Sequence, residues 1–150
     1  MEDRKLIEIN NLVKHFDVDT SFSGKAKVQA VDDVTLYIKK GETLGLVGES
    51  GCGKTTLGRT ILRLYEPTSG QILYDGETIF DSEKNIKKDM YPYRRKMQII
   101  FQDPSASLDP RMTVREIIGE ALDIHNLHKD DRDVRIKELM KKVGLNEEHS

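Results

Sequence analysis

The chain of 150 residues carries 24 Lys and Arg against 26 Asp and Glu, and 37% of its residues are hydrophobic. These values describe a charge-rich globular protein long enough to bury a core, and the net charge of -2 gives no electrostatic case for nucleic acid as the main partner. No apolar run approaches the roughly 20 residues of a membrane span, no apolar signal region follows the first residues, and a single cysteine excludes a disulfide framework within the chain.

The first third of the chain is predicted to be rich in β-structure. Apolar residues at 6, 7, 9, 12 and 13 predict a strand that ends near His15 and Phe16. The polar stretch 17–27, rich in Ser, Gly and charge, predicts a surface loop. Near-alternation of apolar residues over 31–38 predicts a second strand with one covered face, and after a turn at 39–42 the run 43–47 predicts a short buried strand.

Residues 48–55 match the phosphate-binding pattern G-x-x-x-x-G-K-[ST] at every fixed position. A polyphosphate needs several converging N–H groups, which glycines in unusual conformations allow, and a helix must begin where the loop ends, because its unpaired N–H groups and its dipole attract anions. The pattern therefore assigns Lys54 to the β- and γ-phosphates and Thr55 to Mg²⁺. The N–H groups of Gly51, Gly53 and Thr56 are assigned to phosphate oxygens. The predicted nucleotide-binding residues of the loop are Gly48, Glu49, Ser50, Gly51, Cys52, Gly53, Lys54, Thr55 and Thr56. The alternative, a glycine-rich turn with a chance lysine, is disfavoured by the flanking strand and helix signals.

The segment after this phosphate loop alternates helix and strand signals. A helix that should end before Pro67 comes first, with an apolar face formed by Leu57, Ile61, Leu64 and Tyr65. A strand at 71–74 then leads into Asp75-Gly76, a strong hairpin signal. The polar stretch 81–90 predicts a loop with a short helix, 97–101 predicts a buried strand, and 102–110 predicts an irregular segment.

Helical periodicity replaces strand signals after residue 112. Thr113 and Glu116 form a capping-box pattern, and the apolar face that follows consists of Ile117, Ile118, Ala121 and Leu122. A second helix is predicted over about 131–143, ended by Gly144, and its apolar face consists of Ile136, Leu139, Met140 and Val143.

The ordered set of these segments resembles the ATP-binding subunits of ABC transporters. The resemblance rests on Phe16, residues 30–36 and 41–43, the phosphate loop, residues 67–70 and Gln102. Residues 48–54 and 100–113 are similar to the ATPase subunits of bacterial and archaeal dipeptide and oligopeptide importers, and they look more like the second, F-type subunit. The resemblance implies an α/β P-loop NTPase fold: a nucleotide-binding core with an N-terminal antiparallel β-subdomain at 1–104, and the beginning of a helical subdomain at 105–150.

The resemblance also implies site residues outside the phosphate loop. Phe16 would stack on adenine and Val28 would pack on the same base, with a core phenylalanine at a strand end as the alternative for Phe16. Gln102 would approach Mg²⁺ and the attacking water through its amide oxygen, with a solvated loop glutamine as the alternative. The predicted catalytic residues are thus Lys54 and Gln102, and the predicted metal ligands are Thr55 and Gln102.

Four other residues allow two interpretations each. Asp103 could belong to a Walker B site, but Gln102 separates it from the strand, so we interpret it as a turn former before Pro104. Arg94 and Arg95 are either a phosphate clamp or a solvated strand edge. Cys52 is either a reactive thiol near a helix N-terminus or simply a small loop residue.

The function implied by the resemblance is that of an ATP-binding subunit powering import of di- and oligopeptides. Its implied partners are a second ATP-binding subunit, transmembrane permease subunits that hold it at the cytoplasmic face of the membrane and, indirectly, an external peptide-binding protein; no nucleic acid is implied. The family's signature segment, second acidic strand end and switch histidine do not occur in these 150 residues. We therefore expect a fragment of a longer ATPase that binds MgATP without turnover by itself.

Three alternatives stay open at this point. A soluble ABC ATPase of DNA repair or translation is disfavoured by the near-neutral charge. A small P-loop kinase or GTPase is disfavoured because no N-K-x-D guanine motif occurs. A non-hydrolysing nucleotide-binding fragment remains the alternative for the chain taken alone.

Overall fold

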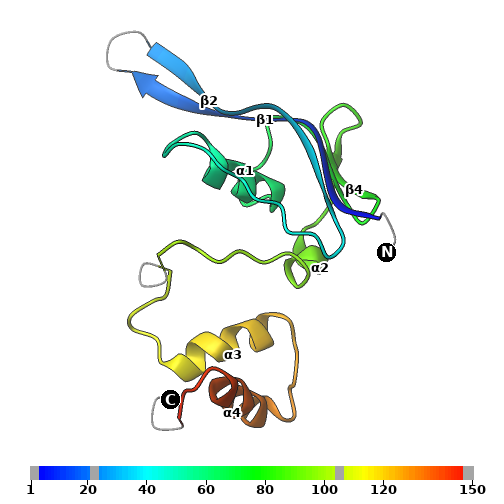
Figure 1. Ribbon diagram of the computed structural model, residues 1–150. Coiled ribbons are helices and arrows are strands. Elements are labelled where there is room, and N and C mark those ends of the chain that lie inside the picture. Colours follow the sequence, from blue (N-terminus) through cyan, green and yellow to red (C-terminus); the bar gives the residue numbers. More distant parts are fainter. Residues whose placement is uncertain (1–3, 21–23, 104–106, 147–150) are drawn as a thin grey trace. The chain divides into compact units, whose positions relative to one another are not determined.

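The computed structural model describes residues 4–20, 24–103 and 107–146 (Figure 1). The chain divides into two compact units, Met1–Gln98 and Ile99–Ser150. The first unit holds the sheet and the phosphate loop, and the second holds a pair of helices.

The first unit is built on a five-stranded antiparallel sheet with the strand order β2-β1-β3-β4-β5. Its strands are β1 (Lys5–Thr20), β2 (Gly24–Lys39), β3 (Ser69–Tyr74), β4 (Glu77–Asp81) and β5 (Ile86–Lys87), and its helices are α1 (Lys54–Ile61) and α2 (Tyr91–Arg94). Helix α1 lies against the hairpin of β1 and β2 (Figure 1). The predicted antiparallel β-subdomain is therefore present.

A bulge in β1 lets the strand contribute twice to the core. Asn11 has a φ of 48° at the point where the register with β2 shifts, between Ile9 and Leu12. Residues three apart on a regular strand face opposite sides, but the extra residue of a bulge restores the same side. Ile9 and Leu12 are both 0% exposed, together with Ile72 and Ile79 of the neighbouring strands.

The predicted surface loop at 17–27 is wrong in the described residues. Strands β1 and β2 continue past Phe16 as a paired ribbon, with Asp17 opposite Lys27 and Thr20 opposite Gly24. Residues 17–19 and 27–28 are exposed. A ribbon that meets water carries polar side chains and lacks the apolar alternation by which strands are recognised, so its composition is that of a loop. Residues 21–23 lie outside the described part.

The hairpin predicted at Asp75-Gly76 is confirmed. Tyr74 pairs with Glu77, and the two turn residues have φ values of 52° and 80°. Positive φ at both central positions is the type I′ geometry, whose twist matches that of the flanking strands. This turn fixes the register of β3 against β4.

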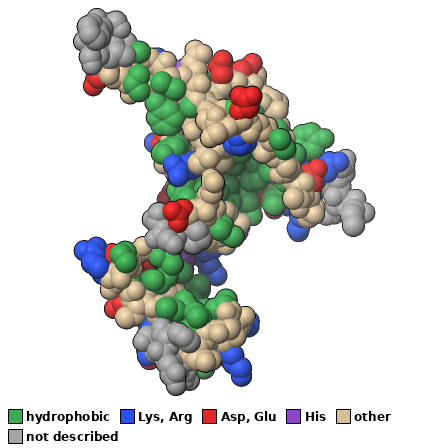
Figure 2. Space-filling view, turned by 60° about the vertical axis from the view of Figure 1, so that its left-hand side comes forward, with side chains coloured by type: hydrophobic (Ala, Val, Ile, Leu, Met, Phe, Trp, Pro, Cys, Tyr) green, Lys and Arg blue, Asp and Glu red, His purple; other side chains and the backbone are tan. Residues whose placement is uncertain are grey.

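The two buried strands predicted at 43–47 and 97–101 do not form in the structure. Both segments lack strand assignment, and Val47 and Ile100 are 97% and 95% exposed. Figure 2 shows that hydrophobic side chains cover parts of the surface. A central strand of a parallel sheet needs hydrogen-bonding partners on both sides, and no described segment pairs with either run.

Helix α1 ends earlier than its apolar pattern predicts. It stops at Ile61, and Leu64, predicted to lie on its apolar face, is 45% exposed. The reason is a turn at Arg63, which adopts a left-handed φ of 50°. The polar stretch 81–90 differs as well, because it contains β5 and the short helix α2 begins only at Tyr91.

The second unit packs α3 (Val114–Ile124) against α4 (Arg132–Lys142). The capping box is confirmed, because the Glu116 N–H donates to the Thr113 hydroxyl and the Thr113 N–H donates to the Glu116 carboxylate. Leu122, Ile136 and Met140 form the core, and Gly144 ends α4 with a φ of 77°. Ala121 and Val143, predicted on the apolar faces, are exposed instead. No helix within the described ranges has the length and apolar character needed to span a membrane.

Candidate functional site

The phosphate loop contains two glycines at which an added Cβ would meet another atom closely. Gly53 has a φ of 93°, and a Cβ there would meet the Ala30 carbonyl oxygen at 2.2 Å. A Cβ at Gly48 would meet the Cys52 sulfur at 2.7 Å. At Gly53 the neighbouring atom is backbone and the φ is positive, which is the usual reason for glycine, whereas at Gly48 the neighbouring atom is the end of a side chain. The loop therefore rests directly on β2 and folds tightly upon itself.

The ammonium group of Lys54 lies at the centre of this loop. Lys54 is the first residue of α1, and its Nζ donates to the carbonyl oxygens of Gly48 at 2.7 Å and of Glu49 at 2.6 Å. Nζ also lies 3.4 Å from the Cys52 sulfur. The loop therefore surrounds a positive charge, and this charge would attract an anion that binds within the loop.

The start of α1 supplies the neutral donors of the site. The first N–H groups of a helix have no partner within it, and the helix dipole adds partial positive charge there. Thr55 is exposed at this end, with a hydroxyl oxygen of the kind Mg²⁺ accepts. Thr56 is turned partly inward, and its carbonyl accepts from the Thr60 hydroxyl at 2.7 Å. The donor set thus fits a magnesium-bound polyphosphate.

Phe16 and Val28 face each other across the hairpin. They are partners in the register of β1 and β2, and directly opposite residues of antiparallel strands share a face. Val28 is 50% exposed and Phe16 is partly exposed, so this pair presents apolar surface. Ala30, which touches Gly53, lies two residues along β2 from Val28, so one strand joins the apolar pair to the phosphate loop.

Gln102 lies in the second unit and is exposed, as is Asp103. Lys54 and Thr55 belong to the first unit, so the approach of Gln102 to a magnesium ion stays a prediction.

Arg94 follows neither interpretation of the sequence, because its guanidinium donates to the Leu62 carbonyl at 2.6 Å at the end of α1.

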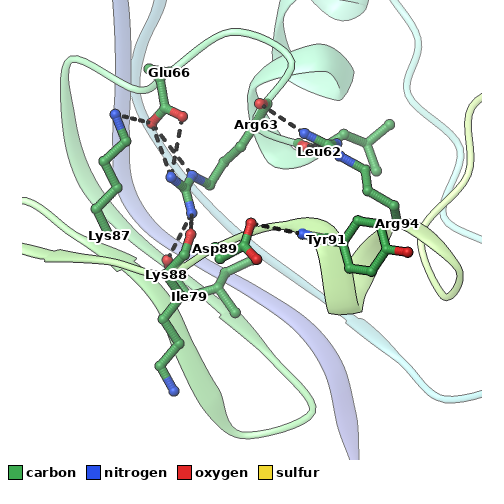
Figure 3. A network of polar contacts seen from close by, with 9 residues as sticks. All are labelled: Leu62, Arg63, Glu66, Ile79, Lys87, Lys88, Asp89, Tyr91 and Arg94. Atoms are coloured by element: carbon green, nitrogen blue, oxygen red, sulfur yellow. Dashed lines mark hydrogen bonds and ion pairs between the residues drawn. The ribbon is translucent and has the colours of Figure 1, made fainter. Parts of the chain in front are cut away.

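A buried arginine that the sequence does not single out stabilises the far end of α1 (Figure 3). Arg63 is 5% exposed, and its guanidinium donates to the carbonyl oxygens of Ile79 at 3.1 Å and Lys88 at 2.6 Å. It also forms an ion pair with Glu66 at 3.1 Å, and Lys87 approaches the same carboxylate at 3.5 Å. No periodicity or motif marks this residue, since arginine is normally a surface residue.

Comparison with known proteins decides the family. Residues 31–150 match the protein family described as "ABC transporter". The chain belongs to the ABC transporter family. The resemblance predicted from the phosphate loop and the segments around it is thereby confirmed.

Curated relatives of this ABC transporter chain carry peptide-transport names. The chain is 53% identical over 148 residues to the oligopeptide transport ATP-binding protein OppF of Bacillus subtilis, covering 97% of this chain and 46% of the relative. It is 45% identical over 153 residues to the dipeptide transport ATP-binding protein DppF of Lactococcus lactis, covering 99% of this chain and again 46% of the relative. The chain thus spans about half the length of these relatives.

Solved structures of ABC transporter cassettes share the fold. A dimeric ATP-binding cassette described as a post-hydrolysis state bound to ADP and Pi matches with a TM-score of 0.67 and 25% identity, covering 96% of this chain and 60% of that one. The structure of cbiO1 from Clostridium perfringens, part of the ABC transporter complex cbiONQ, matches with a TM-score of 0.64 and 24% identity, covering 95% of this chain and 52% of that one. The predicted fold class is therefore confirmed.

Proposed function

We propose that this chain is the nucleotide-binding part of an ATPase subunit that powers import of di- and oligopeptides. The observation that carries the proposal is the phosphate loop wrapped around the Lys54 ammonium at the start of α1. The names of the relatives, which are oligopeptide and dipeptide transport ATP-binding proteins, support the substrate class. The proposed boundary between nucleotide-binding core and helical subdomain lies near residue 104.

The proposed site divides the nucleotide between two groups of residues. Lys54 and the N–H groups of the loop hold the phosphates, and Thr55 gives its hydroxyl to Mg²⁺. Phe16 and Val28 hold the base, since both present apolar surface on the same face of the hairpin. Magnesium, when bound, neutralises phosphate charge. The residues of this chain hold the triphosphate in one orientation and exclude its other orientations.

Turnover needs more than these residues supply. A carboxylate must polarise the attacking water, and we propose that it comes from outside the 150 residues, with Gln102 assisting through its amide. We propose as partners a second ATP-binding subunit, permease subunits that hold the protein at the cytoplasmic face of the membrane and, indirectly, an external peptide-binding protein.

Peptide uptake by cells tests this proposal. In cells that lack the gene, the intact protein should restore uptake of a radiolabelled dipeptide or tetrapeptide, and its Lys54→Ala variant should not. Lys84→Ala removes an exposed lysine with 70% of its side chain in solvent and serves as the matched control. Full uptake with Lys54→Ala, or unchanged peptide uptake in cells without the gene, would contradict the proposal.

A further inference from the structure

The ring of Phe16 contacts an aromatic side chain that the nucleotide-binding motif does not include. Tyr65 meets Phe16 edge to face, with ring centroids 5.3 Å apart and an interplanar angle of 88°. The Lys14 ammonium lies 4.8 Å from the Phe16 centroid. The orientation of the Phe16 ring is thus set by its neighbours as well as by β1.

Tyr65 is itself held by an arginine of α1. The guanidinium of Arg59 donates to the Tyr65 hydroxyl at 2.8 Å and lies 5.5 Å from the centre of the tyrosine ring. The backbone N–H groups of Leu64 and Tyr65 both donate to the Arg59 carbonyl, at 2.8 and 3.3 Å. Side chain and backbone of Arg59 therefore fix the same tyrosine.

The turn that delivers Tyr65 to Phe16 is rigidly anchored. It depends on the left-handed conformation of Arg63, whose buried guanidinium is bound to two carbonyl oxygens of the sheet region and to Glu66 (Figure 3). The Arg94 guanidinium bonds to the Leu62 carbonyl at the start of the same turn. Hydrogen bonds to a buried charge are costly to break, so this turn has one well-defined position.

We propose that Tyr65 is a positioning residue for recognition of the nucleotide base. It fixes the ring of Phe16 so that a purine can stack on it without first ordering the aromatic side chain. The inference rests on the proposed function, because it takes Phe16 as the base-stacking residue. The competing explanation is that Tyr65 only packs α1 against the hairpin. In that case, replacing Tyr65 would lower the affinity for every ligand of the phosphate loop equally.

A comparison of two ligands separates these explanations. In the intact protein, the dissociation constants of MgATP and of magnesium tripolyphosphate, which lacks base and ribose, are measured for wild type and for Tyr65→Leu. We expect Tyr65→Leu to weaken MgATP binding roughly three- to tenfold, the size of an aromatic pair, and to leave tripolyphosphate binding within about twofold. Tyr65→Phe keeps the ring but gives up its hydrogen bond to Arg59, so it should restore only part of the MgATP affinity. Tyr37→Ala, at an exposed tyrosine of β2, is the matched control and should bind both ligands as wild type does.

The other possible results also decide whether Tyr65 has this role. Equal weakening of both ligands, or no change in either, overturns the role of Tyr65, and so does a Tyr65→Phe protein that behaves like Tyr65→Leu. If Tyr65→Leu unfolds at a lower temperature than wild type, Arg59→Met replaces it in the test. Arg59→Met keeps the tyrosine and removes the hydrogen-bond donor to its hydroxyl, so we expect a selective loss of MgATP affinity. An Arg59→Met protein that prefers MgATP over tripolyphosphate as strongly as wild type does overturns the proposal. Failure of the proposed function looks different, because the wild type itself would then bind MgATP no better than tripolyphosphate, or neither.

Discussion

Cys52 is a residue of the phosphate loop whose reactivity can be measured directly. The residue is exposed, and its sulfur lies 3.4 Å from the Lys54 ammonium. A Cβ placed on Gly48 would lie 2.7 Å from that sulfur, so the thiol lies close to the first glycine of the loop. A group attached to the thiol would therefore occupy space that a polyphosphate needs.

Alkylation of Cys52 should block nucleotide binding. We expect N-ethylmaleimide to abolish MgATP binding in the intact protein and MgATP to slow the labelling several-fold, because ligand and reagent compete for the loop. Labelling is followed by mass spectrometry of the peptide that contains Cys52. Cys52→Ala, which keeps the backbone, should bind MgATP and resist the reagent. Labelling at equal rates with and without MgATP would show that the loop does not hold the nucleotide.

Glu77 should give the stability of the first unit an acid dependence. Its carboxylate accepts hydrogen bonds from Lys88 and, at 2.7 Å, from the Tyr93 hydroxyl. These bonds, that of Lys88 first, lower the pKa of Glu77 below 4.5, and the same contact raises the pKa of Tyr93 to about 12. Because the folded pKa is depressed, the stabilisation is complete above the unfolded pKa and is lost as pH falls through the folded one.

The measurement is urea unfolding of the intact protein at pH 7, 5, 4 and 3. Wild type should lose stability below about pH 4.5, and Glu77→Gln should lose less over the same interval because it has no carboxylate to protonate. Glu83→Gln, at an exposed glutamate for which no such bonds are made in the described structure, is the control. If wild type and Glu77→Gln lost the same free energy of unfolding as the pH falls, Glu77 would not be the source of the acid dependence.

At the scale of elements, the sequence predicts best what is locally determined. The hairpin at Asp75-Gly76 and the capping box of Thr113 and Glu116 are correct because each depends on residues within four positions. The runs 43–47 and 97–101 are wrong as strands because strand formation depends on a distant partner, which an apolar run does not reveal. The same holds for the ribbon beyond Phe16, where pairing rather than composition makes the strand.

The early end of α1 shows how one side chain can override a helical pattern. Leu57, Ile61, Leu64 and Tyr65 have helical spacing, yet the chain turns at Arg63 and sends Tyr65 toward the hairpin. In this turn the buried arginine donates to the carbonyl oxygens of Ile79 and Lys88 and to the Glu66 carboxylate, and hydrogen bonds made by a charged group are stronger than neutral ones. Neither the arginine nor its acceptors, 16 and 25 residues away along the chain, form a recognisable motif.

Replacement of Arg63 should therefore damage the element as a whole. Arg63→Met leaves the carbonyl oxygens of Ile79 and Lys88 without their donor, and we expect a loss of about 2–4 kcal/mol in the free energy of unfolding. Arg63→Lys keeps the charge but not the planar fork, so it should recover only part of the loss. Chemical denaturation of the intact protein measures both. A loss below about 0.5 kcal/mol for Arg63→Met would mean that the buried network does not support the turn.

At the scale of the whole molecule, the described chain leaves much apolar surface in water. Leu44, Leu46 and Val47 in the first unit and Ile100 and Phe101 in the second are each more than 40% exposed. Exposed apolar side chains in such runs favour association in soluble proteins. The antiparallel sheet and the helix pair each have a core, but none of these five side chains belongs to either.

The 150 residues produced alone should consequently associate or bind hydrophobic dyes. We expect light scattering to show species larger than a monomer and the thermal transition to be broad. Val47→Lys combined with Ile100→Lys should reduce the association, because charge on exposed apolar positions opposes contact. A sharp, reversible melt of monomeric wild-type chain would contradict this expectation.

We propose above all that the loop around Lys54 binds the phosphates of magnesium-bound ATP. Equilibrium binding of MgATP to the intact protein and to its Lys54→Ala variant, followed by calorimetry with Lys84→Ala as the control, tests it most directly. We expect saturable binding by wild type and by the control, and a loss of at least about tenfold in affinity for Lys54→Ala, because a charge-assisted contact is removed. A Lys54→Ala protein that binds MgATP as tightly as wild type would contradict it.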